Sequence, residues 1–249
     1  MRLINESLDC AQAMQELIRM GVETIITFDA HDNRVQNAIP NNGFDNFFTS
    51  YQFISTILND MPDLIVDNEH LMTISPDEGG MRRAVFYSNQ LGVDMGMFFK
   101  RRNYSTLVNG EHPVISMEFL GNDVSGKDVI IVDDMIASGK TVLEVAKELK
   151  KRNAARVIIC ATFGLFNDGL EELDQAYKEK VFDHIYTTNL CYCPSALKER
   201  PYYHNVDLSR YIALIIDTLN HDTSVNDIMN ATKRIQELLE ERSKNISSK

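Results

Sequence analysis

Short apolar runs alternate with stretches of helical periodicity along most of the chain. The runs, rich in β-branched residues, predict buried strands at 25–28, 71–75, 95–99, 129–132, 156–162 and 183–187. Apolar residues that recur every three or four positions predict helices at 6–20, 51–58, 82–91, 141–151, 169–178, 208–219 and 228–241. Repeated strand–helix units are typical of a parallel sheet with helices on its faces, so we predict an α/β fold.

Two stretches depart from this alternation. Residues 41–49 are rich in turn-forming residues and show no clear strand pattern. Residues 103–127 lie between two predicted strands without strong periodicity, and a connection of that length is often a functional lid. Asn109-Gly110 within it predicts a turn. We therefore interpret 103–127 as a candidate lid over a binding site.

The most informative segment is DVIIVDDMIASGKT, residues 128–141. Its apolar strand ends at Asp133 and Asp134, and ligands of open α/β sheets bind at the carboxyl ends of the strands. A small-residue loop then leads into a helix, whose first N–H groups favour an anion. Carboxylates suit sugar hydroxyls or a divalent cation. The segment therefore predicts a sugar phosphate site.

Two other interpretations of this segment are less favoured. A Walker A loop also ends in GK[ST], but it requires glycine where this chain has Asp134. A single aspartate at a helix start usually only caps the helix. A pair of aspartates directly after an apolar strand favours a functional site instead.

Three further segments place polar side chains at the ends of predicted strands. TIITFDAHDNRVQNAIP brings a strand to Asp29 and His31. SPDEGG follows the strand at 71–75, and its glycines allow the backbone to approach a pyrophosphate closely. MFFKRR ends in three consecutive cations, which in an acidic chain favour an anionic ligand. Each segment alone also fits a hydrogen-bonded histidine, an ordinary turn or a solvated basic cluster.

Taken together, the four segments resemble the ribose-phosphate pyrophosphokinase (PRPP synthetase) family. VIIVDDMIASGKT is similar to the PRPP-binding loop of the type I phosphoribosyltransferase fold, and SPDEGG matches the family's S-P-D-x-G-G turn. The D-x-H segment and the K-R-R segment resemble the family's nucleotide-contacting strand and its flexible catalytic loop. The resemblance implies transfer of the diphosphoryl group of MgATP to the 1-hydroxyl of ribose 5-phosphate, which gives PRPP and AMP.

The resemblance also implies a role for individual residues. Those expected to bind ribose 5-phosphate are Asp133, Asp134, Ala137, Ser138, Gly139, Lys140 and Thr141. Those expected at the pyrophosphate or nucleotide are Asp77, Gly79 and Gly80. Contacts to Mg²⁺, the implied cofactor, are expected from His31, Asp77 and Asp29. The catalytic cations, which would stabilise charge on the transferring group, are expected to be Lys100 and Arg102.

The family's domain plan implies how the chain is divided. Residues 1–49 are expected to be the C-terminal part of an ATP-side domain, and 50–222 a phosphoribosyltransferase-like domain that binds ribose 5-phosphate, with 223–249 as a helical tail. The chain thus looks N-terminally truncated relative to the family. Ala137, Lys140 and Phe163 depart from the family pattern, in which an acid is common at the first position and a histidine at the last.

Composition narrows the class of protein. A formal net charge of −11 and a pI near 5.0 argue against non-specific nucleic-acid binding. The apolar runs are too short to span a bilayer, so we expect a cytoplasmic protein with ATP and ribose 5-phosphate as partners. The family's ring interfaces imply a homo-oligomer. Two alternatives remain: a phosphoribosyltransferase that consumes PRPP, and a non-catalytic PRPP synthetase-associated or PRPP-sensing subunit.

Overall fold

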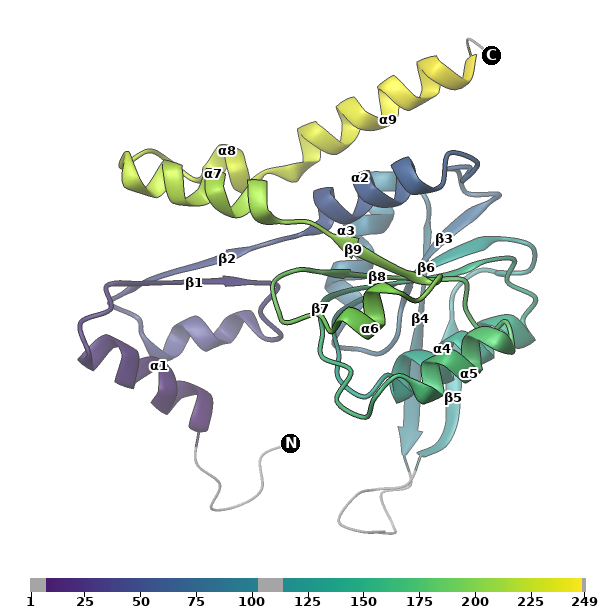
Figure 1. The fold of residues 1–249 in the computed structure, drawn as a ribbon, viewed down its shortest axis with the longest axis horizontal. Helices are drawn as coiled ribbons and strands as arrows, with labels where there is room; N and C mark the ends of the chain where they lie inside the picture. Colours follow the sequence, from purple (N-terminus) through teal and green to yellow (C-terminus); the bar gives the residue numbers. More distant parts are fainter. Residues whose placement is uncertain (1–7, 103–113, 248–249) are drawn as a thin grey trace. The chain divides into compact units, whose positions relative to one another are not determined.

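A computed structural model describes residues 8–102 and 114–247 of the chain (Figure 1). The chain forms two compact units, residues 1–49 and 50–249. The first unit contains helix α1 (Asp9–Arg19), strand β1 (Thr24–Phe28), the 3₁₀ helix η1 (Asn33–Ala38) and strand β2 (Gly43–Phe47). β1 and β2 pair in parallel as a two-stranded sheet.

Strand β2 corrects the interpretation of residues 41–49 as turns alone. Asn41 and Asn42 precede the strand, and Gly43 pairs with Thr24 at its start. A side chain at Gly43 would not fit there, because its Cβ would lie 2.6 Å from the Thr24 hydroxyl. Phe47 is buried at the other end of the strand, 5.8 Å from the ring of Phe28. The glycine that suggests a turn instead lets two strands approach closely.

The second unit is built on a seven-stranded sheet in the order β5-β4-β3-β6-β7-β8-β9. The strands are β3 (Leu71–Ser75), β4 (Asp94–Arg102), β5 (Val114–Leu120), β6 (Asp128–Ile136), β7 (Val157–Gly164), β8 (His184–Thr188) and β9 (Tyr203–Val206). β5 pairs antiparallel with β4, and the other neighbours pair in parallel. The predicted α/β fold with a mostly parallel sheet is confirmed.

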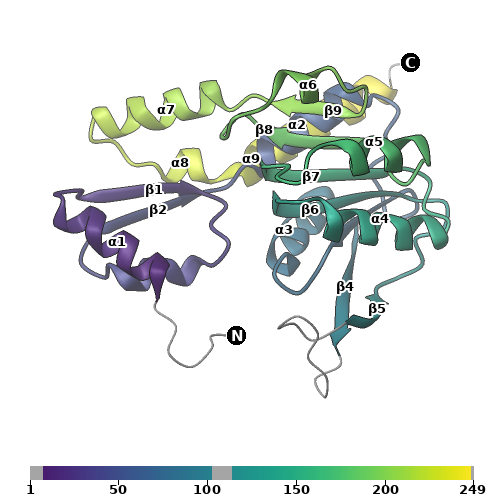
Figure 2. The same ribbon diagram turned by 60° about the horizontal axis from the view of Figure 1, so that its bottom comes forward.

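Helices cover both faces of this sheet (Figures 1 and 2). The helices in the described part of this unit are α2 (Ser50–Asp60), α3 (Met81–Leu91), α4 (Lys140–Lys151), α5 (Glu171–Lys178), α6 (Ser195–Lys198), α7 (Ser209–Asn220), α8 (Asn226–Met229) and α9 (Ala231–Ser247). Val129 and Ile131 of β6 pack in one core cluster with α4 and α5, whereas Ile130 and Val132 alternate with them and are buried too. The central strand is therefore covered on both sides.

Strands β5 and β9 are absent from the sequence prediction, and both are edge strands of the sheet. β5 falls within the segment 103–127 that was interpreted as a lid. Residues 103–113 of that segment, including the predicted turn at Asn109-Gly110, lie outside the described residues. β4 is longer than predicted because its second half pairs with β5, from Met97↔Leu120 to Arg102↔Val114.

Helix α9 packs against α2 and α3. Its Arg242 side chain donates hydrogen bonds to backbone carbonyls at and after the end of α2, among them those of Leu58 and Met61 at 2.6 and 3.1 Å. These carbonyls have no partner within the helix, so the guanidinium acts as a cap. No helix in the described part of the chain is both long and apolar enough to cross a membrane.

Candidate active site

The predicted phosphate loop lies at the carboxyl end of β6, between the strand and helix α4. β6 continues to Ile136, past the predicted end at Val132, because β7 also continues and pairs Phe163 with Met135. Gly139 adopts a φ of +87°, which glycine reaches without strain, and α4 begins at the next residue. The N–H groups of the first turn of α4 therefore border the loop and favour an anion there.

Asp133 and Asp134 lie within the strand, side by side. The backbone N–H of Asp134 donates to Asp133 Oδ1 at 2.9 Å, and Asp134 is buried. Burial raises the pKa of the Asp133 carboxyl to about 7, with further contributions from Asp134 and, more weakly, Asp77. Such a site gains from hydroxyl donors or a cation, since either stabilises the ionised carboxylate.

Arg83 approaches these carboxylates from helix α3, and the sequence analysis did not single it out. Its Nη1 atom lies 3.9 Å from Asp133 Oδ1, and the two side chains are only 17% and 19% exposed. The signal in the sequence was Arg82-Arg83, which follows the glycine pair after one residue, at the start of a helix that faces the aspartates. Arg83 thus adds, beside Asp133, a cation that was not predicted together with Lys100, Arg102 and Lys140.

The SPDEGG turn connects β3 to α3 beside β6. Oδ1 of Asp77 accepts hydrogen bonds from the N–H groups of Gly79 and Gly80, at 2.8 and 3.1 Å. A Cβ at Gly80 would lie 2.8 Å from the Ser75 hydroxyl and 3.3 Å from the Val132 carbonyl, so only glycine fits between the two strands. Both amides expected at a pyrophosphate are therefore present at the strand end, where the Asp77 carboxylate binds them.

The cationic segment lies on β4 beyond the last pairing of that strand with β3, at Ser75↔Met97. Nζ of Lys100 forms an ion pair with Oε2 of Glu144 on α4 at 2.8 Å. Arg101 lies 3.8 Å from Glu118 of β5. The backbone of Arg102 pairs with Val114, and its side chain is outside the described part of the chain. The two-stranded arm β4–β5 thus carries Lys100 to the phosphate-loop helix.

Lys140, at the start of α4, is also bound to a carboxylate. Its Nζ atom lies 2.9 Å from Oδ2 of Asp168, and this hydrogen bond raises the pKa of Lys140. Asp168 belongs to the β7–α5 connection, which also supports the loop itself: the N–H of Asn167 donates to the Ala137 carbonyl at 2.8 Å. The connection after β7 therefore holds the phosphate loop in place.

Asp29 and His31 belong to the first unit. Asp29 is 6% exposed, and its Oδ2 atom accepts a hydrogen bond from the Thr49 hydroxyl at 2.8 Å. Its φ of +43° is uncommon for a residue with a side chain. His31 is exposed. Within residues 8–102 and 114–247, no group of three or more His, Cys, Asp or Glu side chains could hold a metal ion.

Comparison with known proteins adds to this geometry. Residues 49–195 match the family described as phosphoribosyl transferase domain. The chain belongs to that family. The match includes the SPDEGG turn, the cationic segment and the phosphate loop, so one family covers all three parts of the site in the second unit.

Curated relatives place the chain more narrowly within this family. A ribose-phosphate pyrophosphokinase of Mycoplasma genitalium is 31% identical over 70% of this chain and 48% of its own length. One from Vibrio parahaemolyticus is 30% identical over 86% of this chain and 63% of its own length. The chain spans about half to about two thirds of the relatives it matches. The predicted membership of the PRPP synthetase family is confirmed.

A solved structure supports the fold. The phosphoribosylpyrophosphate synthetase from Mycobacterium smegmatis has a TM-score of 0.73 to this chain, with 23% sequence identity. The superposition covers 88% of this chain and 65% of that protein. The architecture of the two chains is therefore the same over most of the length of this one.

Proposed function

We propose that this chain transfers the diphosphoryl group of MgATP to the 1-hydroxyl of ribose 5-phosphate, as a ribose-phosphate diphosphokinase. One observation carries the proposal: the phosphate loop, the paired aspartates and Lys100 lie at one edge of one sheet. Relatives about 30% identical that are named for this activity support it. Because those relatives are longer, the activity of this chain by itself is part of the proposal.

In the proposed reaction the phosphate loop holds the 5-phosphate. The N–H groups at the start of α4 and the hydroxyls of Ser138 and Thr141 would donate to its oxygens. Asp133 and Asp134 would accept hydrogen bonds from the ribose hydroxyls, which orients the 1-hydroxyl for attack on the β-phosphorus of ATP. AMP leaves, and no covalent nucleophile on the protein is needed. Positioning and electrostatic stabilisation then supply most of the rate enhancement.

The second half of the proposed site binds the group that is transferred. The N–H groups of Gly79 and Gly80 would contact the pyrophosphate. The Asp77 carboxylate, which accepts hydrogen bonds from these groups in this structure, would then bind a cation instead. Lys100 and Arg102 would neutralise charge that develops on the diphosphoryl group. Asp29 and His31, in the first unit, are proposed to contact the Mg-nucleotide.

The carboxylate oxygens at this edge of the sheet are donors of the type that Mg²⁺ prefers. Mg²⁺ takes oxygen ligands and is commonly held by one or two carboxylates together with substrate phosphates and water. Burial, together with the nearby Asp134 and Asp77 carboxylates, raises the pKa of Asp133, and a bound cation would stabilise the ionised form. When bound, Mg²⁺ would neutralise charge on the phosphates. We propose Asp77 as its first carboxylate ligand, because that side chain is exposed.

The decisive experiment measures products in two arms. The chain is incubated with MgATP and ribose 5-phosphate, and AMP and PRPP are quantified. In parallel it is incubated with PRPP and a panel of bases, and pyrophosphate is quantified. AMP and PRPP in equal amounts are expected from the first arm. Pyrophosphate from the second arm alone would instead indicate a phosphoribosyltransferase.

A third arm addresses the non-catalytic alternative. Binding of ribose 5-phosphate is measured by calorimetry with the same preparation. Binding without turnover at any MgATP concentration would contradict the proposal and favour a PRPP-sensing or associated subunit. An Asp133→Asn variant, which removes a proposed contact to the ribose hydroxyls, is expected to lose most of this binding.

Two further assignments belong to this proposal. The family implies that the protein acts in the cytoplasm on small phosphorylated substrates and does not bind nucleic acid, in keeping with the net charge of −11. It also implies a homo-oligomer. Sedimentation velocity of the purified chain tests the second point, and a monomer across the micromolar range would contradict it.

A further inference from the structure

Lys100, the proposed catalytic cation, has a specific partner that the reaction does not use. Its Nζ atom lies 2.8 Å from Oε2 of Glu144, on the second turn of α4. The Lys100 side chain is 19% exposed, whereas that of Glu144 is 56% exposed. The ammonium group is therefore held close to the phosphate-loop helix, and the carboxylate that holds it faces water.

An exposed carboxylate can leave such a pair at small cost. Ion pairs with a solvated member contribute little to stability, because water stabilises the separated carboxylate almost as well. A phosphate bears more negative charge and more acceptor oxygens than a carboxylate, so it binds an ammonium group more strongly. A substrate phosphate at Lys100 would therefore displace Glu144 into solvent.

The second proposed phosphate-contacting lysine shows the same arrangement. Lys140 lies 2.9 Å from Asp168, whose side chain is 48% exposed. Arg156, far along the sheet from the phosphate loop, pairs with the exposed Asp63 but also with Asp128, whose side chain is only 12% exposed. Both lysines proposed to contact phosphate, in contrast, have an ion-pair partner that is exposed enough to turn to solvent.

We propose that Glu144 is a positioning residue for Lys100: its carboxylate occupies, in the ligand-free protein, the place of a substrate phosphate oxygen. The inference rests on the proposed function, since it assumes that Lys100 meets a phosphate. Glu144 keeps the ammonium group ordered beside α4 before the substrate arrives. It also sets a threshold, because an anion must bind Lys100 better than a carboxylate does in order to enter.

The test is a double-mutant cycle on the binding of inorganic pyrophosphate, measured by calorimetry with the full chain. Glu144→Gln is expected to tighten binding about threefold, because no ion pair must be broken. Lys100→Met is expected to weaken binding about fivefold. In the Lys100→Met background, Glu144→Gln should have no effect, because the group it competes for is gone.

A matched control separates displacement from overall charge. Glu148 lies one turn further along α4 and pairs with Lys151, so Glu148→Gln makes the same charge change away from Lys100. Its pyrophosphate affinity should stay within about 1.5-fold of the wild type. Equal tightening by both substitutions, tightening by Glu144→Gln in the Lys100→Met background, or no binding of pyrophosphate by the wild type would each overturn the inference.

The readout does not depend on turnover, so it can succeed where the proposed activity fails. If the chain is active, a kinetic signature follows as well. The Glu144 carboxylate competes with the phosphate for Lys100 in the free enzyme, so its removal strengthens the binding of substrate and of transition state equally. Glu144→Gln should therefore lower KM for MgATP about threefold and leave kcat unchanged. A lowered kcat with unchanged KM would show that Glu144 acts in the reaction itself, which contradicts displacement.

Discussion

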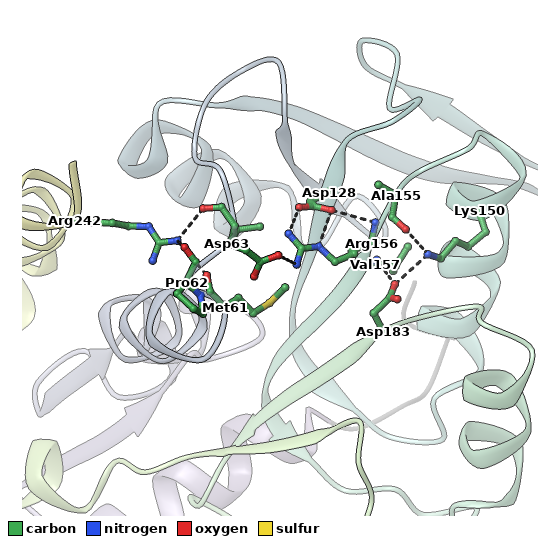
Figure 3. A network of polar contacts seen from close by, with 11 residues as sticks. Met61, Pro62, Asp63, Asp128, Lys150, Ala155, Arg156, Val157, Asp183 and Arg242 are labelled. Carbon is green, nitrogen blue, oxygen red and sulfur yellow. Dashed lines mark hydrogen bonds and ion pairs between the residues drawn. The ribbon is translucent and has the colours of Figure 1, made fainter. Parts of the chain in front are cut away.

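At the amino edge of the seven-stranded sheet, Arg156 lies between Asp128 and Asp63, whereas at the carboxyl edge Asp133 lies beside Asp134. Figure 3 shows the first arrangement, in which Arg156 nitrogens lie 2.6 and 2.7 Å from the two carboxylates. The second arrangement places two acids in neighbouring positions, with the guanidinium of Arg83 3.9 Å from Asp133.

The pKa values of the two edges differ in the same sense. The pKa of Arg156 is raised, chiefly by its hydrogen bonds to Asp128, and the pKa of Asp63 is lowered, chiefly by the charge of Arg156. The pKa of Asp133 is instead raised to about 7 by burial and by its acidic neighbours. Opposite charges in contact stabilise the fold, while crowded like charges cost stability and leave charge available for a ligand.

The largest expected effect is at the carboxyl edge. Lys100→Met should lower kcat for PRPP formation by about 10² to 10³, because a cation aimed at developing phosphate charge contributes mainly in the transition state. Thermal stability should change little, since the Glu144 partner of Lys100 is mostly exposed. AMP release measures the first quantity and circular dichroism the second. Lys151→Met, which changes an exposed lysine of α4, is the control and should keep full activity.

The amino edge should give the reverse result. Arg156→Met is expected to lower the free energy of unfolding by about 3 kcal/mol, because it leaves the Asp128 carboxylate nearly buried without its charged partner. The catalytic constant of the folded protein should be unchanged. Urea denaturation measures the loss, and Arg19→Met, which removes an exposed ion pair with Glu16, should cost less than about 0.5 kcal/mol. Equal losses for the two variants would show that the amino edge does not stabilise the fold.

The sequence predicted the central strands of the sheet better than its outermost strands. β3, β6 and β7 are covered on both faces, so they appear as continuous apolar runs. β5 and β9 lie at the edges, and β2 belongs to a two-stranded sheet, so these strands carry fewer buried residues and mix polar with apolar positions. Their pairing depends on partners far away in sequence, which periodicity does not show.

The same contrast holds for the site: residues that are contiguous in sequence were predicted, and contacts between distant residues were not. Residues 133–141 were identified because strand, acids and loop are contiguous, and the geometry of one βα turn brings them together. The ion pairs of Lys100 with Glu144 and of Lys140 with Asp168 join residues 44 and 28 positions apart, and no local pattern indicates them. Arg83 was missed for the same reason, because its contact with Asp133 depends on β3 and β6 being neighbours.

The pH dependence of stability sharpens the comparison at the carboxyl edge. The pKa of Asp133 is about 3.8 when unfolded and about 7 when folded, so the folded state binds the proton more tightly. Its contribution to stability is therefore lost as pH rises from about 4 through 7. Asp133→Asn should raise the free energy of unfolding by about 2 kcal/mol at pH 8 without metal, and by much less at pH 4. A pH-independent difference in urea denaturation would contradict the raised pKa.

The smallest expected effect is on the pH dependence of stability at the amino edge, where stability falls as pH decreases and not as pH rises. His204 Nδ1 lies 3.1 Å from Asp60 Oδ2, and its Nε2 lies 2.9 Å from His184 Nδ1. Burial lowers the pKa of both histidines, and the charge of Asp60 acts in the opposite direction on both. The pKa of His184 is lowered further by His204 and by Arg156, whereas Asp183 raises it. The unfolded chain therefore binds protons more readily, so stability is present above pH 6.5 and falls as pH decreases below it.

His204→Gln removes one of these titrating groups. The decrease in the free energy of unfolding between pH 7 and pH 5 should then be shallower than in the wild type, whatever the offset between the curves at pH 7. His221→Gln is the matched control, because His221 is 65% exposed and pairs with Asp217 on the surface of α7. Parallel curves for wild type and His204→Gln would show that the pair does not titrate on unfolding. A shallower curve for His204→Gln, together with the expected result for Asp133→Asn, would mean that the two edges respond to pH in opposite directions. The physical reason is that the carboxyl edge buries an acid beside other acids, whereas the amino edge buries two imidazoles beside each other.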